Sequence, residues 1–362
     1  MKIGILTHPL TDNYGGILQA VALYGFLESK GHDVTILRRH RNRSTWRNAV
    51  IFLLERAPFQ NIRMYKYFAK KAKKQKKFID ENLPNKTRIV HTTSELKKVT
   101  KRLKLDAVIV GSDQVWRMSS VDDGHFGNYF LDFISDIRIK KISYAASFGK
   151  DVWEAPEKTE QVKKLLSKFH AVSVRECSGI DICNDFLGVE NCYCVLDPTL
   201  LVKKSFYDSF LIPTKRTTKP EMFLYILDAS SKNQEIISTA CKLMGNIHRI
   251  KNALDIKQDI LTVPQWISAI KNADYVITDS FHGTIFCIIF HKQFISIGNK
   301  KRGLARFLSL TKSLGLENRV IESPDQVEKV INCKIDYTNV ESKISQLREH
   351  SENFLIKALS DK

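Results

Sequence analysis

The chain has 362 residues, of which 43% are hydrophobic and 27% are charged, and its 57 Lys and Arg against 39 Asp and Glu give a net charge of +18. This composition is typical of a soluble globular protein and excludes collagenous, low-complexity and small disulfide-stapled classes. At roughly 100–200 residues per domain, the length predicts two domains, each large enough for its own core.

The sequence does not suggest a membrane span or a secretory leader. No uninterrupted apolar run is longer than Ala49 to Leu54, which is far shorter than the ~18–20 residues that a span requires. Too few apolar residues precede His8 and Pro9 to form the core of a leader. We therefore expect the chain to begin folding at its first residue, in the cytoplasm. The seven cysteines, an odd number, predict reduced and buried thiols rather than a disulfide framework.

Short apolar segments alternate with amphipathic segments through the first half of the chain. This alternation predicts strands joined by helices, and the continuous apolar character of the strands predicts a mostly parallel sheet covered on both faces. Strands are expected at 2–7, 34–37, 106–110, 141–145, 171–174 and 193–196, and helices at 17–29, 158–168 and 178–186.

A second set of such segments follows the polar stretch Pro213–Pro220. We predict strands at 222–227, 246–250, 275–278 and 294–297, and helices near 233–244, 265–271, from His282 onward and at 340–359. The fold class is therefore α/β, with two Rossmann-like domains that face a cleft lined by the carboxyl ends of their strands. The expected divisions are an N-terminal domain at 1–205, a C-terminal domain at 206–325, and a helical segment at 326–362 that packs back on the N-terminal domain.

Much of the excess positive charge lies between Arg38 and Arg88, where sixteen Lys or Arg stand against three acidic residues. Ile62, Tyr65 and Phe68/Ala69 recur at helical spacing and predict one or two basic amphipathic helices. Three interpretations remain open for this basic segment: a solvated helix face, an anionic membrane surface, or a nucleic-acid surface. Because no nucleic-acid-binding motif accompanies it, we expect no nucleic-acid partner.

The segment Thr278–Thr284 lies between an apolar strand and an apolar helix. The N–H groups and dipole of a helix that starts there suit an anion, and His282 would suit proton transfer. A plainer alternative is that Asp279 and Ser280 cap the helix and His282 sits in its first turn.

Polar residues also follow three strands in the first half. Gly111–Arg117 would line the cleft from the N-terminal domain or, as the alternative that we favour, form a tight turn with a capped helix. Arg175 would bind a carboxylate or phosphate, or else pair with Glu176 at the surface. Asp197 would cap a helix, or hold a sugar hydroxyl or a catalytic histidine. No metal triad is visible and Asn13–Gly16 is not a dinucleotide loop, so neither a metal nor a nucleotide cofactor is expected.

Taken together, these segments resemble the polysaccharide pyruvyl transferase family. The matching pieces occur in family order over roughly residues 2–320: Asn13–Gly16 with Leu18–Ala20, Gly111–Gln114 with Trp116, Tyr144–Gly149, Ser173–Glu176, Asp197–Thr199 and Thr278–Thr284. The resemblance implies a GT-B-like fold and transfer of pyruvate from phosphoenolpyruvate, as co-substrate, onto a sugar as a cyclic ketal.

The resemblance also implies site residues. His282 and Asp197 would be catalytic. The donor would be bound by Arg175, Ser280, Phe281, Gly283, Thr284, Arg302 and Arg306, with Lys300 and Lys301 nearby, and the acceptor by Asp12, Asn13, Gly15, Ser112, Asp113 and Gln114. Family members often carry an arginine directly before the histidine, where this chain has Phe281. We expect Arg175, Arg302 or Arg306 to replace that cation.

Acceptors in this family are commonly glycan repeat units on a lipid diphosphate. The basic segment would then hold a cytoplasmic enzyme at the inner face of an anionic membrane, each basic residue contributing about 1 kcal/mol at most. Two alternatives from other classes remain: a nucleotide-sugar glycosyltransferase of the same fold, and a non-catalytic basic protein that binds glycan or nucleic acid.

Overall fold

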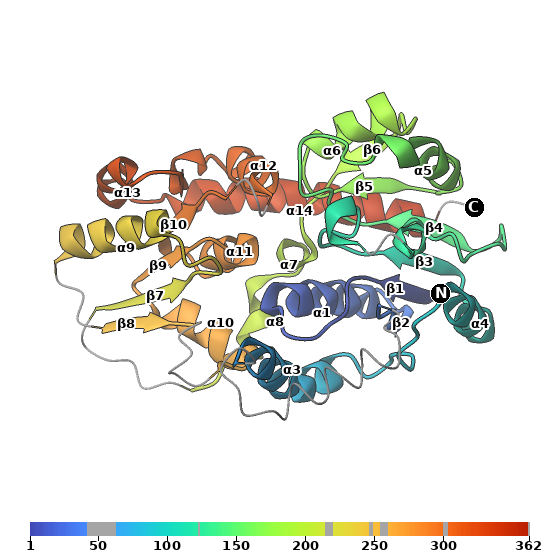
Figure 1. Ribbon diagram of the computed structural model, residues 1–362, viewed down its shortest axis with the longest axis horizontal. Coiled ribbons are helices and arrows are strands. Elements are labelled where there is room, and N and C mark those ends of the chain that lie inside the picture. The colour runs from blue at the N-terminus through green and yellow to red at the C-terminus, as the bar shows by residue number, and fades with distance from the viewer. Residues whose placement is uncertain are drawn as a thin grey trace. The chain divides into compact units, whose positions relative to one another are not determined.

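The computed structural model describes residues 1–41, 63–121, 124–213, 220–245, 249–253, 260–299 and 303–360. The chain divides into two compact units, drawn together in Figure 1. Unit 1 comprises Met1–Leu201 and Leu347–Lys362, and unit 2 comprises Val202–Gln346.

Unit 1 is built on parallel strands. A four-stranded sheet has the order β2-β1-β3-β4, with β1 at Lys2–Leu6, β2 at Asp33–Leu37, β3 at Ala107–Val110 and β4 at Lys140–Ser143. A parallel pair, β5 (Val172–Val174) and β6 (Cys192–Cys194), continues from β4 through the bridges Ile142–Ala171 and Ala146–Val174. The carboxyl ends of the parallel strands therefore meet at one edge.

Helices cover this sheet, and the first of them is buried on nearly every side. Helix α1 reads as almost continuously apolar because it has no solvent face until its last turn. The helices of unit 1 are α1 (Tyr14–Ser29), α3 (Arg63–Asn82), α4 (Thr93–Leu103), α5 (Thr159–Leu166), α6 (Ser178–Asp181), a π turn at Ile182–Phe186 and α7 (Pro198–Leu201), with 3-10 turns at Met118–Ser120, Phe126–Phe130 and Pro156–Lys158.

The final helix, α14 (Tyr337–Ser360), ends in unit 1. There Arg348 Nε donates to the Leu200 carbonyl at 2.9 Å, and Leu196 N donates to Ser351 Oγ at 2.9 Å. These bonds attach the second half of α14 to the segment around α7.

Unit 2 contains a five-stranded parallel sheet in the order β11-β10-β9-β7-β8. Its strands are β7 (Glu221–Tyr225), β8 (Arg249–Asn252), β9 (Tyr275–Thr278), β10 (Gln293–Ile297) and β11 (Val320–Ile321). Its helices are α8 (Lys204–Asp208), α9 (Ser231–Met244), α10 (Val263–Asn272), α11 (Phe281–Ile289), α12 (Leu304–Leu314) and α13 (Val327–Asn332), with 3-10 turns at Glu317–Arg319 and Pro324–Gln326. Edge-to-face contacts of Phe286 with Tyr207 and Trp266 lie in its core.

The structure confirms the predicted α/β class, and the described strands lie within a few residues of the predicted ranges. Residues 246–248 of one predicted strand lie outside the described residues, and β8 covers 249–252. The sequence pattern missed α4, α8, α12 and the two-residue strand β11. Helix α4 buries Leu96 and Thr100, and Val99 and Leu103 pack against the same core, so its apolar residues recur at helical spacing and the helix could have been predicted.

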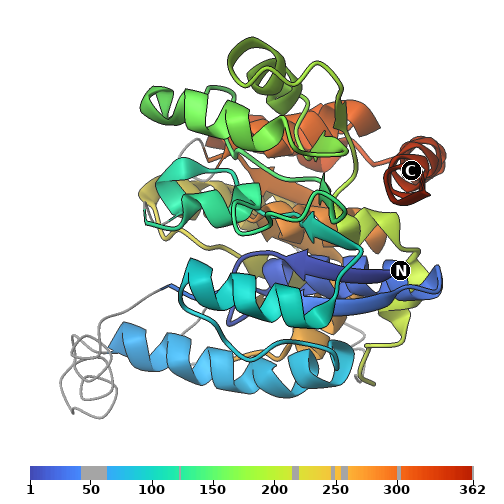
Figure 2. The same ribbon diagram turned by 90° about the vertical axis from the view of Figure 1, so that its right-hand side faces the viewer.

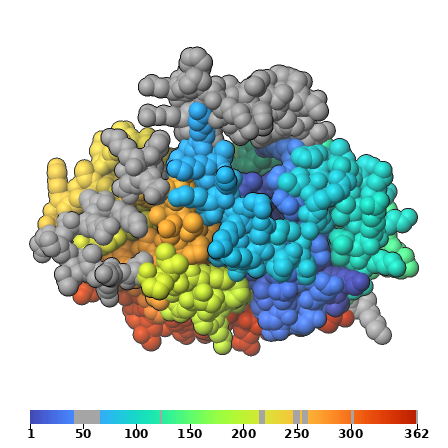
Figure 3. Space-filling model, turned by 90° about the horizontal axis from the view of Figure 1, so that it is seen from below, coloured from blue at the N-terminus to red at the C-terminus, as the bar shows by residue number. Residues whose placement is uncertain are grey.

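Within the basic segment the structure describes residues 38–41 and 63–88, of which Arg63–Asn82 form α3, and residues 42–62 lie outside the described residues. The predicted apolar face of this helix is wrong at Phe68, which is 43% exposed. The buried face instead carries Lys71, Gln75, Phe78 and Ile79. Lysine can occupy such a face because its long stem packs there while its ammonium lies 4.3 Å from the centre of the Tyr14 ring. Helix α3 is light blue in Figure 2 and lies on the face of the molecule seen in Figure 3. Most of its other lysines are exposed.

Within the described residues, no helix combines the length and the apolar character needed to cross a membrane. All seven cysteines are free thiols. Cys183 and Cys287 are buried as expected, whereas Cys177 and Cys333 are exposed, so the expectation of uniformly buried thiols is wrong.

Candidate functional site

The turn between β9 and α11 in unit 2 carries the predicted histidine. Ser280 is the N-cap of α11, and its Oγ accepts a hydrogen bond from Gly283 N at 3.2 Å. Thr278 Oγ1 donates to the Tyr225 carbonyl at 2.7 Å and accepts from Ser280 N at 3.0 Å. The capping role weighed for Ser280 is therefore present, and the Thr278 hydroxyl links the turn to β7.

Asp279 does not cap α11. Its carboxylate accepts hydrogen bonds from Leu227 N at 2.6 Å, Asp228 N at 2.9 Å and Asn233 Nδ2 at 3.3 Å. A buried carboxylate requires such donors. Asp279 therefore anchors the loop after β7 beside the start of α11.

His282 and Phe281 are both buried at the start of α11, with their ring centres 5.4 Å apart. Phe281 also packs edge-to-face on Phe307 of α12. The guanidinium carbon of Arg306 lies 5.1 Å from the centre of the Phe281 ring, and Arg306 Nε donates to the Gly303 carbonyl at 3.4 Å. A cation thus lies beside the position at which the family resemblance implies an arginine, and a cation–π contact holds it there.

Two further predicted donor residues have structural tasks in this turn. A β-carbon on Gly283 would overlap the Thr278 hydroxyl, so only glycine fits without displacement. Thr284 is fully buried, and its Oγ1 donates to the Ser280 carbonyl and lies 2.5 Å from Ser296 Oγ. The Thr284 side chain therefore braces α11 against β10.

A buried polar cluster lies at the strand ends of unit 1. Arg175 Nη1 donates to Asp197 Oδ2 at 2.8 Å and to Ser112 Oγ at 3.3 Å, and Ser112 Oγ donates to the same Asp197 oxygen at 3.0 Å. Arg175 Nη2 lies 3.9 Å from Asp113 Oδ1. The side chains of Arg175 and Asp197 are both 1% exposed, so each charge depends on the other for its stability.

The alternative of an Arg175–Glu176 surface pair is wrong. Glu176 is buried, and its carboxylate accepts from Ser147 Oγ at 3.0 Å and Gly149 N at 2.8 Å. The other Asp197 oxygen accepts from Thr199 N at 3.0 Å and Thr199 Oγ1 at 2.6 Å, at the start of α7. Asp197 thus joins the ends of three strand segments rather than standing open to solvent.

The predicted acceptor residues gather around the start of α1. A β-carbon on Gly16 would lie 3.1 Å from Asn13 Nδ2 and 3.4 Å from Asp113 Oδ2, so both side chains approach this glycine. Asp113 has φ +82 and its Oδ1 accepts from Gln114 N at 2.8 Å. The other predicted acceptor residues lie in the same turns. Asp12 accepts a hydrogen bond from the Thr11 hydroxyl at 2.8 Å, and Gly15 is buried. Gln114 Oε1 accepts a hydrogen bond from Arg117 Nη1 at 2.7 Å.

The structure thus groups Ser112, Asp113, Arg175 and Asp197 in unit 1 and Ser280–Thr284 with Arg306 in unit 2. Arg302, with Lys300 and Lys301, lies outside the described residues. Sequence reasoning missed buried Lys71, whose pKa is lowered by burial and raised in part by Asp12. A uniform run of lysines offers no signal that one of them faces inward.

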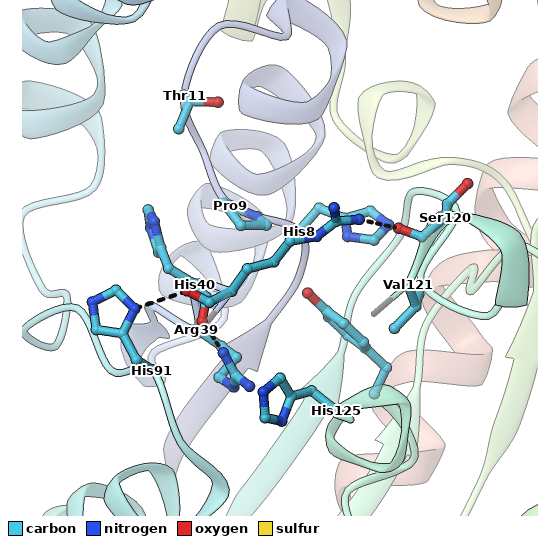
Figure 4. A pocket seen from close by; sticks show the side chains of 11 residues that line it. His8, Pro9, Thr11, Arg39, His40, His91, Ser120, Val121 and His125 are labelled. Carbon is cyan, nitrogen blue, oxygen red and sulfur yellow. Dashed lines mark hydrogen bonds between the residues drawn. The ribbon is translucent and has the colours of Figure 1, made fainter. Parts of the chain in front are cut away.

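Sequence reasoning also missed a pocket lined by four histidines and two arginines (Figure 4). Its members His8 and Arg39–Arg41 directly follow β1 and β2. The other candidate motifs were selected because they follow predicted strands, and the same criterion could have selected these residues.

Several solved structures share this fold. The chain resembles UDP-N-acetylglucosamine 2-epimerases from Listeria monocytogenes (putative; 7% identity, TM-score 0.56, covering 99% of this chain and 96% of that one) and Rickettsia bellii (9%, 0.53, 99% and 97%). It also resembles an α-glucosyltransferase in complex with UDP and DNA (10%, 0.50, 99% and 94%). These likenesses define the class of the fold as GT-B-like.

The family follows from the sequence. The sequence model of the polysaccharide pyruvyl transferase family matches residues 13–301 of the chain. The chain therefore belongs to this family of transferases. Among proteins with curated descriptions, none matches the chain.

Proposed function

We propose that the protein transfers pyruvate from phosphoenolpyruvate to two hydroxyls of a glycan, forming a cyclic ketal and releasing phosphate. The observation that carries this proposal is the Arg306 guanidinium on Phe281, next to His282 at the start of α11. Phosphoenolpyruvate carries a carboxylate and a phosphate, and a fixed guanidinium with a helix N-terminus suits such a donor.

The chemistry requires one proton donor. Protonation of the methylene carbon of phosphoenolpyruvate makes a methyl group and leaves a cationic carbon that the first sugar hydroxyl attacks. The second hydroxyl displaces phosphate at this carbon, so two C–O bonds form, the bond to phosphate breaks, and the two hydroxyl protons end on the methyl group and the phosphate. We assign the proton transfer to His282, a step worth roughly 10²–10⁴ in rate.

The donor contacts in unit 2 would be the start of α11, from Ser280 to Thr284, and Arg306, with Arg302 as a further cation outside the described residues. In unit 1 we propose that Arg175 serves the donor as the family resemblance implies. Asp197 then acts by holding that guanidinium in place through its 2.8 Å contact. The acceptor would lie against the turn that carries Asp12, Asn13, Gly15, Ser112, Asp113 and Gln114.

The direct test is phosphate release from phosphoenolpyruvate in the presence of oligosaccharide or lipid-linked glycan acceptors. We expect acceptor-dependent release by the native chain and its loss in His282→Gln. His291→Gln is the matched control, because His291 is an exposed histidine of unit 2 whose Nε2 lies 2.8 Å from Glu341 Oε1. Wild-type turnover by His282→Gln would refute the assignment.

One rival is a nucleotide-sugar glycosyltransferase, favoured only by the shared fold. A thermal-shift comparison separates the two: stabilisation by phosphoenolpyruvate supports pyruvyl transfer, and stabilisation by nucleotide sugars alone supports the rival. A non-catalytic binding protein would instead show binding that falls steeply with salt, no turnover, and indifference to His282→Gln.

We further propose that the basic segment holds the enzyme at an anionic membrane surface. On α3 the exposed lysines are Lys66, Lys70, Lys73, Lys76 and Lys77. Co-sedimentation should then require anionic lipid in the vesicles, and equal binding to neutral vesicles would contradict the proposal.

A further inference from the structure

A pocket of about 440 Å³ lies in unit 1, at the ends of β1 and β2. Figure 4 shows His8, Arg39, His40, His91 and His125 gathered around it from separate segments of the chain. Thr11, Arg41, Ser120 and Tyr129 complete its polar lining. Of the residues implied above as acceptor contacts, none lines this pocket among those that the structure describes.

The guanidinium of Arg39 is buried and held in place. Its Nε donates to Asn128 Oδ1 at 2.8 Å, and its Nη1 donates to the His40 carbonyl. Asn128 in turn donates to Thr93 Oγ1 at 3.0 Å and Asp132 Oδ1 at 2.8 Å. Because this network fixes the cation before any ligand arrives, little side-chain entropy is lost on binding.

Arg41 and His91 form the accessible side of the pocket. Arg41 Nη2 donates to the Ser120 carbonyl at 3.0 Å. The Arg41 carbonyl lies 3.0 Å from His91 Nδ1, and a carbonyl only accepts, so Nδ1 must donate and Nε2 remains for another partner. The His91 ring lies edge-to-face with His40 at 6.3 Å. Both Arg41 and His91 are exposed, so a ligand can reach them.

The charge of the lining favours an anion. Among the described residues that line the pocket, none is acidic; Asp122 and Asp123, which follow Val121 in the chain, lie outside the described residues. Burial raises the pKa of Tyr129 to about 12, against the opposing effect of Arg39 and Arg41, so its hydroxyl keeps its proton at neutral pH. Despite the four histidines, no group of three metal-ligating side chains able to hold an ion occurs in the described part of the chain.

We propose that this pocket binds the phosphate or diphosphate group of a phosphorylated ligand. Guanidinium groups donate in pairs to phosphate oxygens, and imidazole N–H groups and a tyrosine hydroxyl supply further donors. The described lining residues all belong to unit 1, and the proposal stands whether or not the proposed pyruvyl transfer is correct.

A second pocket, of about 420 Å³, shares His8, Pro9, Thr11, Arg39 and His40 with the first. Its other lining residues include apolar Leu10, Ile36 and Ile79 and basic Lys73 and Lys76 of α3. The hydrocarbon chain of a lipid phosphate would contact the apolar residues of this second pocket, whereas a small soluble phosphate has no hydrocarbon chain to make these contacts. The two pockets thus allow the source of the phosphate to be distinguished.

The test is calorimetric titration of the full chain with inorganic pyrophosphate. We expect saturable binding that weakens about tenfold or more in Arg41→Gln and in His91→Ala, since each loses a charged or polar donor. Arg138→Gln is the matched control, with the same change of charge at a side chain that is 86% exposed. His282→Gln and Arg306→Gln should bind as the native chain does.

Competition then identifies the source. Displacement of pyrophosphate by geranyl diphosphate, more strongly than by phosphoenolpyruvate, assigns the site to a lipid-linked diphosphate, and the reverse order assigns it to a soluble phosphate. The proposal is overturned by absence of saturable binding, by native affinity in both Arg41→Gln and His91→Ala, by loss of binding only in the unit 2 variants, or by failure of both competitors. Binding without turnover would refute the proposed function and leave this site intact.

Discussion

The guanidinium carbon of Arg306 lies 5.1 Å from the centre of the Phe281 ring, so a cation lies next to the position at which the family resemblance implies an arginine. Phe281 is the residue directly before His282 and contacts its ring. The cation at this place is thus supplied by α12 instead of α11, and it makes a cation–π contact with the Phe281 ring.

Arg306→Gln should weaken donor binding. We expect KM for phosphoenolpyruvate to rise about tenfold or more, because a charge-assisted contact with the donor is lost. Lys312→Gln makes the same change of charge at an exposed position on α12 and should leave KM unaltered. An unchanged KM in Arg306→Gln would show that another group binds the donor.

Gly283→Ala should destabilise unit 2. The new β-carbon would overlap the Thr278 hydroxyl, and such overpacking typically costs about 1–3 kcal/mol in the free energy of unfolding. Adding Thr278→Ala to Gly283→Ala should recover part of the loss, since it removes the overlapping atom. Urea unfolding measures both variants, with Gly124→Ala as the control because no atom lies within 4 Å of its added β-carbon. Equal stability of Gly283→Ala and the native chain would contradict this packing.

Asp197→Asn should cost about 3 kcal/mol in the free energy of unfolding, because it leaves the buried Arg175 charge without its counterion. The double variant Arg175→Met with Asp197→Leu removes both charges, so it should be more stable to unfolding than Asp197→Asn. Asp185→Asn, at an exposed aspartate of unit 1, is the control for denaturant unfolding. A loss below about 1 kcal/mol would mean that Arg175 finds compensation elsewhere.

The two faces of α3 should respond differently in vesicle binding. Lys70→Met removes an exposed charge and should reduce partition onto anionic vesicles by up to about fivefold, from about 1 kcal/mol per basic residue. Lys71→Met alters a buried lysine over Tyr14 and should leave partition unchanged. Equal effects of the two changes would argue against membrane contact through the exposed face.

The alternation of apolar strands and helices sufficed to predict the α/β class, because fully buried parallel strands read as unbroken apolar runs. The sequence pattern could not predict contacts between residues that are distant in the chain. The residues around Arg175 do not indicate that Asp197 neutralises its charge, and the run of lysines does not indicate that Lys71 is buried. The pocket of His8, His40, His91 and His125 escaped for the same reason, since its members lie on separate segments that only the fold brings together.

The central claim is pyruvyl transfer with proton delivery at His282. The most direct measurement is mass spectrometry of the glycan product after reaction with phosphoenolpyruvate in D₂O. We predict a pyruvate ketal whose methyl group has gained one deuterium, formed by the native chain and by His291→Gln but not by His282→Gln. Absence of ketal from the native reaction with glycan acceptors, or ketal formation by His282→Gln at the native rate, would contradict it.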